Sequence, residues 1–181
     1  MQNSKNYSRL QIFFMDKLKS PILLDQHHDV DDFDCGAEPL NNYLKNFALT
    51  NNQNGSARTY VTTKAGKVAG YYTLTPGSVT KATTPQRIGK GLANHPVPVI
   101  IIARLAVDKT EQGHGIGTAL VRDALLRIVD AAEIIGGRAV LVHAKDAEAK
   151  RFYEQLGFYP SPIDTHHLYL LIKDIKKTLE L

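Results

Sequence analysis

The chain has 181 residues, of which 43% are hydrophobic and 22% are charged, and its formal net charge is +4. This length fits one domain, and this composition excludes a long disordered or low-complexity chain. No apolar run approaches the ~18 residues of a membrane-spanning helix, and the apolar patch at residues 10–14 is too brief for a secretory signal. The only cysteine, Cys35, forms no internal disulfide, so we expect a cytoplasmic protein with a half-buried thiol at this position.

The first half of the chain predicts short strands around one helix. Residues 22–24 predict a short strand. Pro39 predicts the start of a helix, because proline is favoured in the first turn, and apolar residues at helical spacing continue it to residues 51–55. Residues 58–63 and 68–75 are β-rich runs joined by four turn residues, which is typical of a hairpin.

The second half alternates strands and helices. Residues 76–96 hold three prolines and three glycines and predict a loop with a short helix. In chain order we then expect a strand at 97–107, a helix at 115–130, a strand at 139–143, a helix at 147–156, a strand at 168–172 and a short charged helix.

This order of elements predicts the fold class. A hairpin followed by a strand–helix–strand crossover indicates a mixed α/β fold, with a single central mixed sheet flanked by helices. No internal repeat and no linker divides the sequence. In open sheets of this kind, ligands bind beyond the carboxyl ends of parallel strands. We expect residues 112–117, which follow the strongest predicted strand, at that edge.

Residues 112–117 (QGHGIG) are the most informative feature of the sequence. A glycine-rich turn that opens a helix leaves several backbone N–H groups unpaired and directed at one spot. Together with the positive end of the helix dipole, these groups bind phosphate without a cationic side chain. Such turns are common, so the spacing alone is a weak signal.

Two side chains near this edge are candidates for function. Arg104 interrupts an apolar strand, and a buried guanidinium must be paired or reach a polar cleft. Pairing with an internal acid and lining a substrate cleft are equally consistent with the sequence. Tyr153 follows Phe152 directly, so it projects about 100° away around the helix, either at a rim or into a cleft.

The glycine turn and the later Ala149-x-x-Phe152-Tyr153-x-x-x-Gly157-Phe158 resemble motifs A and B of the GNAT superfamily of N-acetyltransferases. The resemblance implies an acyl-CoA N-acyltransferase fold with acetyl-CoA as co-substrate, its pyrophosphate on the turn and its pantetheine along the preceding strand. It also implies that Tyr153 donates a proton to the departing CoA thiolate. Many members have an asparagine three residues before the motif B alanine, where this chain has Asp146. The residues implied in cofactor binding are Leu105, Ala106, Val107, Gln112, Gly113, His114, Gly115, Ile116, Gly117, Thr118, Ala149 and Phe152.

A wider pattern, from about residue 22 to residue 172, resembles the GNAT toxins of bacterial toxin–antitoxin modules (the TacT and AtaT type). This resemblance implies acetylation of the α-amino group of aminoacyl-tRNA, which inhibits translation. It also implies a ribbon-helix-helix antitoxin as partner and a homodimer. Residues 1–20 lie outside the pattern, so we expect an N-terminal extension there and an acetyltransferase domain at residues 21–181.

The residue types fit this chemistry. A free α-amine titrates near 7.7–8.0, so part of it is neutral in the cell and no strong general base is needed. A tyrosine of pKa about 10 is a suitable acid for a thiolate whose conjugate acid titrates near 8.5. His143, at a strand end, is the nearest candidate base, although a structural role is more common. Candidate phosphate contacts for a tRNA substrate are Lys45, Arg58, Arg87, Lys90 and Arg104.

Other interpretations stay open at this point. His27, His28 and the neighbouring aspartates lack the usual ligand spacing, so we expect no metal site. The chain could instead be a GNAT enzyme that acts on a small amine or a protein N-terminus, or a non-catalytic module that binds acetyl-CoA. The acidic segment at residues 25–38 either contacts an antitoxin or solvates a turn.

Overall fold

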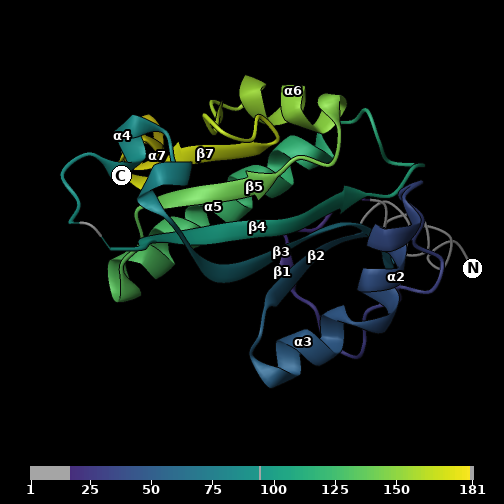
Figure 1. Cartoon of the computed structure of the whole chain (residues 1–181). Coiled ribbons are helices and arrows are strands. Elements are labelled where there is room, and N and C mark those ends of the chain that lie inside the picture. Colours follow the sequence, from purple (N-terminus) through teal and green to yellow (C-terminus); the bar gives the residue numbers. More distant parts are fainter. Residues whose placement is uncertain (1–16, 94, 180–181) are drawn as a thin grey trace, which may run out of the picture. The chain divides into compact units, whose positions relative to one another are not determined.

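The computed structural model describes residues 17–93 and 95–179. Seven strands are hydrogen-bonded in the order β1-β2-β3-β4-β5-β7-β6, and this confirms the predicted mixed α/β fold with a single sheet (Figure 1). The chain divides into two compact units, one made of the residues up to Thr73 with Arg104–Leu120, the other of Leu74–Ala103 with the residues from Val121 onward. The predicted extension at residues 1–20 lies outside the described residues except for its last four.

The first unit contains the short strand β1 (Ile22–Leu23), the hairpin of β2 (Arg58–Lys64) and the start of β3 (Lys67–Val79), and two helices, α2 (Glu38–Asn46) and α3 (Ala48–Asn54). β1 pairs antiparallel with β2. The hairpin turns through Ala65 and Gly66, whose φ angles of 50° and 82° are those of the tight turns that match strand twist. Its core includes Leu44, Val61 and Tyr71, all at most 1% exposed.

The single helix predicted from residue 39 to residues 51–55 is wrong, because the chain forms two helices there. The backbone of Phe47 leaves the helical region, with φ −125° and ψ −30°. This break leaves Phe47 53% exposed and turns Ala48 fully inward, at 0% exposure. After this change of direction, α3 therefore begins with a fully buried alanine.

The second unit is built around the strand β5 (Ala139–His143), which lies between β4 (Val97–Val107) and β7 (His167–Leu171). β5 pairs parallel with β4, from Val99 opposite Ala139 to Ile102 opposite Val142, and antiparallel with β7. The bounds predicted for β4 and β5 are confirmed. The other elements of this unit are the 3₁₀ turn η1 (Lys81–Thr83), the helices α4 (Gln86–Gly89) and α6 (Ala147–Gln155), and the strand β6 (Tyr159–Pro160).

Two predicted boundaries in this unit are corrected. β3 continues to Val79 through the residues predicted as a loop, because Gly77 lets the strand pass close to Ile101. A Cβ atom at Gly77 would lie 2.6 Å from Ile101 Cδ1. Helix α5 (Ile116–Ile135) is also longer than predicted, and its last two residues, Ile134 and Ile135, are 83% and 72% exposed.

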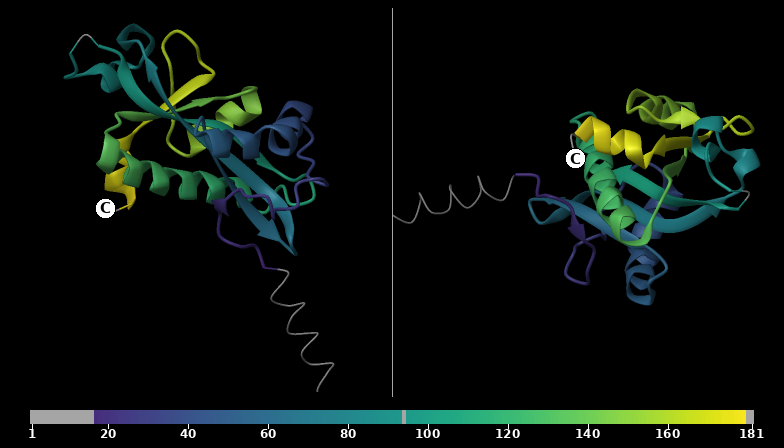
Figure 2. Two further views of the ribbon diagram at one scale, coloured as in Figure 1. Left: turned by 90° about the horizontal axis from the view of Figure 1, so that it is seen from below. Right: turned by 90° about the vertical axis from the view of Figure 1, so that its left-hand side faces the viewer.

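The C-terminal helix α7 (Ile172–Leu179) follows β7 directly. Figure 2 shows this helix in yellow beside the C-terminal part of α5 in green, and Lys176 of α7 forms an ion pair with Glu133 of α5. Ile172 and Ile175 are buried, whereas the lysines of the helix face outward or pair with acids. Within the described part of the chain, no helix combines the length and the apolar character needed to cross a bilayer.

Candidate active site

The end of β4 and the start of α5 form the glycine-rich turn in the first unit. After β4, the amide of Asp108 bonds to the carbonyl of Ala69 at 2.9 Å, and its carboxylate accepts a bond from the Thr110 amide at 2.9 Å. Gly113 and Gly115 have φ angles of 80° and 79°, which residues with a Cβ rarely adopt. These two glycines therefore shape the turn that precedes the first helical residue of α5.

The turn presents its backbone to solvent. Residues 112–115 and Thr118 are exposed, whereas Ile116 is 6% exposed and anchors the helix start in the core. The first N–H groups of a helix have no partner within it, and the dipole places positive charge at this end. With its apolar side chain turned inward and its backbone outward, the turn has the geometry of an anion site that uses amide donors.

Gly70 of β3 allows this helix start to approach the sheet. A Cβ atom at Gly70 would lie 3.0 Å from Leu120 Cδ1 and 3.1 Å from the carbonyl oxygen of Ala106. The absence of a side chain at Gly70 therefore allows the start of α5 to pack closely on β3 within this unit.

The acidic segment at residues 25–38 holds this turn in place. The side-chain amide of Gln112 donates to the carbonyls of Cys35 at 3.1 Å and Val107 at 2.9 Å. The amide of Lys109 donates to the carbonyl of Asp34 at 2.8 Å, and the Asp34 amide donates to Asp108 Oδ2 at 2.9 Å. Lys109 also forms an ion pair with the Asp34 carboxylate. Part of the acidic segment is thus a clamp on the glycine-rich turn. The side chain of Gln112 is one of the groups that connect the turn to this segment.

Replacing Asp34 with asparagine should make the free energy of unfolding depend less on pH in the acid range. The hydrogen bond from Lys109, followed by those from the Gly36 amide and Asn41, holds the pKa of the Asp34 carboxyl well below its ordinary value. Because the folded pKa is depressed, this carboxylate stabilises the fold above its unfolded pKa of about 3.9, and the contribution is lost as the pH falls toward the folded pKa. Urea unfolding between pH 3 and pH 7 measures this directly.

The matched control for that measurement is Asp31→Asn, which removes an exposed carboxylate from the same segment. We expect this variant to keep the wild-type pH profile. Equal profiles for the Asp34 and Asp31 variants would contradict a specific clamp.

Tyr153 lies on α6 in the second unit. Asp146 caps this helix, since its carboxylate accepts a hydrogen bond from the Ala149 amide at 2.8 Å. An aspartate in place of the usual asparagine therefore still forms a good helix cap. Phe152 and Phe158 pack edge-on against the Tyr153 ring, at centroid distances of 5.1 and 5.4 Å. Tyr153 is 7% exposed, and burial raises the pKa of its hydroxyl well above the ordinary value. The hydroxyl therefore stays protonated at neutral pH and acts as a hydrogen-bond donor.

Among the described residues, Arg104 forms no ion pair with an acid, so the predicted pairing with an internal acid is not seen, and its role at a substrate cleft stays a prediction. Its guanidinium carbon lies 3.7 Å from the centroid of the Tyr43 ring, which is a cation–π contact inside the first unit. Tyr43 in turn stacks on Tyr71, whose hydroxyl donates to the Leu40 carbonyl at 2.8 Å. The aromatic face thus accounts for how a half-buried guanidinium is tolerated in this strand.

The other predicted cations differ in whether their charged groups already form contacts within the protein. Arg58 donates to the carbonyl of Asn52, so its guanidinium ties α3 to β2. Lys45, at the end of α2, is exposed. Arg87 and Lys90 lie in the second unit around α4, and Arg87 pairs with Asp174 at 3.0 Å. The structure therefore gives Arg58 a structural task and leaves Lys45 and Lys90 with exposed side chains.

His143 stacks on His167 at the end of β5, with the ring centroids 4.1 Å apart. Desolvation, and then the nearby His167, lower the pKa of His143. A neutral imidazole is able to accept a proton, but His143 is held in a pair with another strand residue. This geometry fits a rim histidine at least as well as a general base.

A profile of the acetyltransferase (GNAT) domain matches residues 55–160, which covers both motifs. The chain belongs to the GNAT acetyltransferase family. A tRNA-acetylating toxin of Mycobacterium tuberculosis is 44% identical over 162 residues, which cover 90% of this chain and 97% of that protein. Among solved structures, AtaT complexed with acetyl-methionyl-tRNAfMet matches with a TM-score of 0.83 and 29% identity, over 90% of this chain and 99% of that one. A tyrosine-to-phenylalanine variant of AtaT bound to the C-terminus of the antitoxin AtaR and acetyl-CoA matches with a TM-score of 0.78 and 28% identity, over 92% of this chain and 100% of that one.

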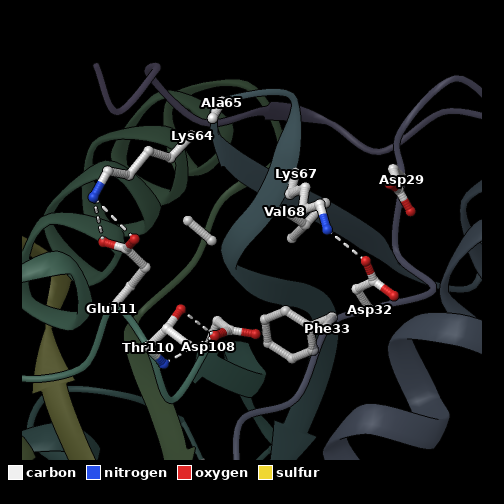
Figure 3. Close-up of a pocket in the computed structure, with 11 residues that line it drawn as sticks. Asp29, Asp32, Phe33, Lys64, Ala65, Lys67, Val68, Asp108, Thr110 and Glu111 are labelled. Carbon is white, nitrogen blue, oxygen red and sulfur yellow. Dashed lines mark hydrogen bonds and ion pairs between the residues drawn. The ribbon is translucent and has the colours of Figure 1, made fainter. Parts of the chain in front are cut away.

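The acetyltransferase also has a charged pocket of about 330 Å³ beside its β2–β3 hairpin (Figure 3). Lys64 pairs with Glu111 at 2.9 Å and Lys67 pairs with Asp32 at 2.5 Å, while the Phe33 ring is drawn beside the Asp108 carboxylate. These pairs join the glycine-rich turn and the acidic segment to the two residues that flank the turn of the hairpin, Lys64 and Lys67. The lining has four carboxylates, from Asp29, Asp32, Asp108 and Glu111, against these two lysines, so the pocket carries an excess of negative charge.

Sequence reasoning found both motifs of the acetyltransferase but not the groups that support them. The clamp formed by Asp34, Cys35 and Lys109 left no local signal, since its members are separated by more than seventy residues in the chain. The one available hint was the acidic composition of residues 25–38. Among the residues that the structure describes, no group of three or more His, Cys, Asp or Glu side chains is arranged to hold a metal ion.

Proposed function

We propose that this chain is the toxin of a toxin–antitoxin pair and transfers the acetyl group of acetyl-CoA to the α-amino group of aminoacyl-tRNA. The observation that carries the proposal is the 44% identity to a tRNA-acetylating toxin along 97% of that protein. The likeness to AtaT complexed with acetyl-methionyl-tRNAfMet, at 29% identity, supports the same substrate class. Residues 21–181 form the acetyltransferase domain in this proposal, and residues 1–20 form an extension.

The cofactor is acetyl-CoA, which relatives of this fold bind. The backbone amides of residues 112–118 take its pyrophosphate, and the strand backbone from Leu105 to Val107 lies along its pantetheine. Ala149 and Phe152 of α6 complete the cofactor contacts. The exposed amides at the start of α5 and the inward anchor Ile116 support this assignment.

In the reaction, the neutral α-amine attacks the thioester carbon and a C–N bond forms. The tetrahedral intermediate collapses, the C–S bond breaks, and the amine loses a proton to solvent. Tyr153 donates a hydrogen bond, and then its proton, to the departing sulfur, and the resulting tyrosinate takes a proton back from solvent. Because burial raises the pKa of Tyr153, stabilisation of the thiolate by the hydrogen bond precedes the proton transfer.

The partners in this proposal are the charged tRNA, a ribbon-helix-helix antitoxin and a second copy of the chain. Structures of AtaT with the antitoxin AtaR support an antitoxin partner. Lys45, Arg58, Arg87, Lys90 and Arg104 are the proposed cations for tRNA contacts, in the cytoplasm, where charged tRNA is found. The engagement of Arg58 and Arg104 in internal contacts weakens the case for these two.

Product analysis tests the proposal. The protein is incubated with labelled acetyl-CoA and, separately, with charged tRNA, uncharged tRNA and polyamines. We expect label in charged tRNA only, and we expect mild alkali to release it with the amino acid, because that bond is an ester. Label in polyamines would favour a small-amine acetyltransferase, and no transfer with retained acetyl-CoA binding would favour a binding module.

A further inference from the structure

The second unit contains a cavity of about 530 Å³ lined by Lys81, Thr84, Gln86, Arg87, Gly89 and Lys90. We call it the basic cavity. Three of its six lining residues are cationic and none is acidic. The segment from residue 74 to residue 103 has these three Lys and Arg residues and no Asp or Glu. Positive charge is therefore concentrated in one short stretch of the chain, around η1 and α4.

The backbone that carries these cations is held in place by hydrogen bonds within the unit. Arg138, directly before β5, donates to the carbonyls of Ile88 and Lys90, both at 3.0 Å. Ser161 donates to the carbonyl of Thr83 at 2.8 Å. These bonds hold both sides of the segment in place in the folded protein. A ligand therefore does not have to order the wall of the cavity, and binding loses less conformational entropy.

The cationic side chains are also oriented. The stem of Lys81 crosses Gly89, where a Cβ atom would lie 2.9 Å from Lys81 Cγ, and its ammonium donates to the Leu92 carbonyl at 2.8 Å. The guanidinium of Arg87 lies 5.7 Å from the centroid of the Tyr159 ring. Gly89 and Tyr159 thus position two cations at the rim of one cavity.

These cations keep donors for a ligand. Arg87 uses one nitrogen to bond Asp174, and its side chain is 62% exposed, so further N–H groups face solvent. Lys90 is exposed, and its ammonium has no ion-pair partner among residues 17–93 and 95–179. A planar guanidinium, a free ammonium and the exposed Gln86 amide form a donor set that suits phosphate oxygens.

We propose that the basic cavity binds backbone phosphates of the RNA substrate. The inference rests on the proposed function and names where, in the second unit, the RNA is held. Three cations and no acid in the lining of one cavity favour a chain of phosphodiesters over a single anion, because the affinity for a polyanion rises with the number of phosphates that cations neutralise. An acidic protein segment is the other source of such charge, and the experiment below separates the two.

The test compares Lys90→Glu with Lys177→Glu, which makes the same charge change on an exposed residue of α7 outside the cavity. Binding of labelled, uncharged tRNA is measured by fluorescence anisotropy across a salt series. We expect Lys90→Glu to weaken binding about tenfold and to lower the salt slope by about one, while Lys177→Glu stays near the wild type. The KM for charged tRNA should rise, with kcat unchanged and with no change for a short aminoacyl-nucleoside substrate.

The outcomes separate this inference from the proposed function. If the wild type binds tRNA, Lys90→Glu alone weakens that binding and no charged tRNA is acetylated, the function is refuted and the cavity stays supported. Wild-type protein that acetylates charged tRNA, with Lys90→Glu and Lys177→Glu behaving alike, would refute the cavity alone. Loss of antitoxin binding with unchanged tRNA binding in Lys90→Glu would assign the cavity to an acidic protein segment and also overturn the inference. Lys90→Arg, which keeps the charge, should retain binding.

Discussion

Replacing Tyr153 with phenylalanine should lower kcat by roughly 100- to 10,000-fold, the range in which a positioned proton donor contributes. The substitution removes one oxygen and keeps the ring, which packs between Phe152 and Phe158. Folding and acetyl-CoA affinity should therefore change little, because the contacts that bury the ring are kept. Turnover is measured with charged tRNA and labelled acetyl-CoA, and cofactor affinity by calorimetry.

Tyr159→Phe is the matched control for this prediction. Tyr159 is in the same unit, and its hydroxyl is buried without a hydrogen-bond partner among the described residues. Removing that hydroxyl leaves no partner unsatisfied, so we expect stability and turnover close to wild type. Full turnover in Tyr153→Phe would remove Tyr153 from the mechanism, and equal losses in both variants would indicate a general packing effect.

Replacing Gly115 with alanine should weaken acetyl-CoA binding by at least about tenfold. Gly115 has a φ of 79°, and a residue with a Cβ loses about 1–2 kcal/mol in the left-handed region. The chain relieves this strain by rotating the backbone of the turn, and the amides before α5 then no longer converge on one anion. Calorimetric titration of acetyl-CoA into the pure protein measures the change.

Gly136→Ala separates this effect from a general loss of stability. Gly136 follows α5 and has a φ of 81°, and a Cβ atom added at Gly136 or at Gly115 would meet no heavy atom within 4 Å. The backbone strain is therefore the same in both variants, whereas only Gly115 lies at the start of the helix. We expect both variants to lose similar unfolding free energy and only Gly115→Ala to lose cofactor affinity. Equal affinities would refute the role of the turn.

The resemblance to the GNAT superfamily rested on residues that are close together in the sequence. Gln112 to Gly117 and Ala149 to Phe158 are local motifs, because a turn that opens a helix and a helix that ends at a glycine each involve neighbouring residues. The family match over residues 55–160 confirms the resemblance. The roles of the individual side chains, Tyr153 among them, stay predictions until the variants are measured.

The sequence by itself determined the family, the mixed α/β fold class, and the bounds of β4 and β5, whose continuous apolar runs are typical of buried strands. Only the tertiary structure decided the break at Phe47, the continuation of β3 past Gly77 and the clamp of Asp34 on the turn before α5. The physical reason is that periodicity and turn propensity are properties of neighbouring residues. A close approach of two strands, or an ion pair between residues 75 positions apart, depends on partners that only folding brings into contact.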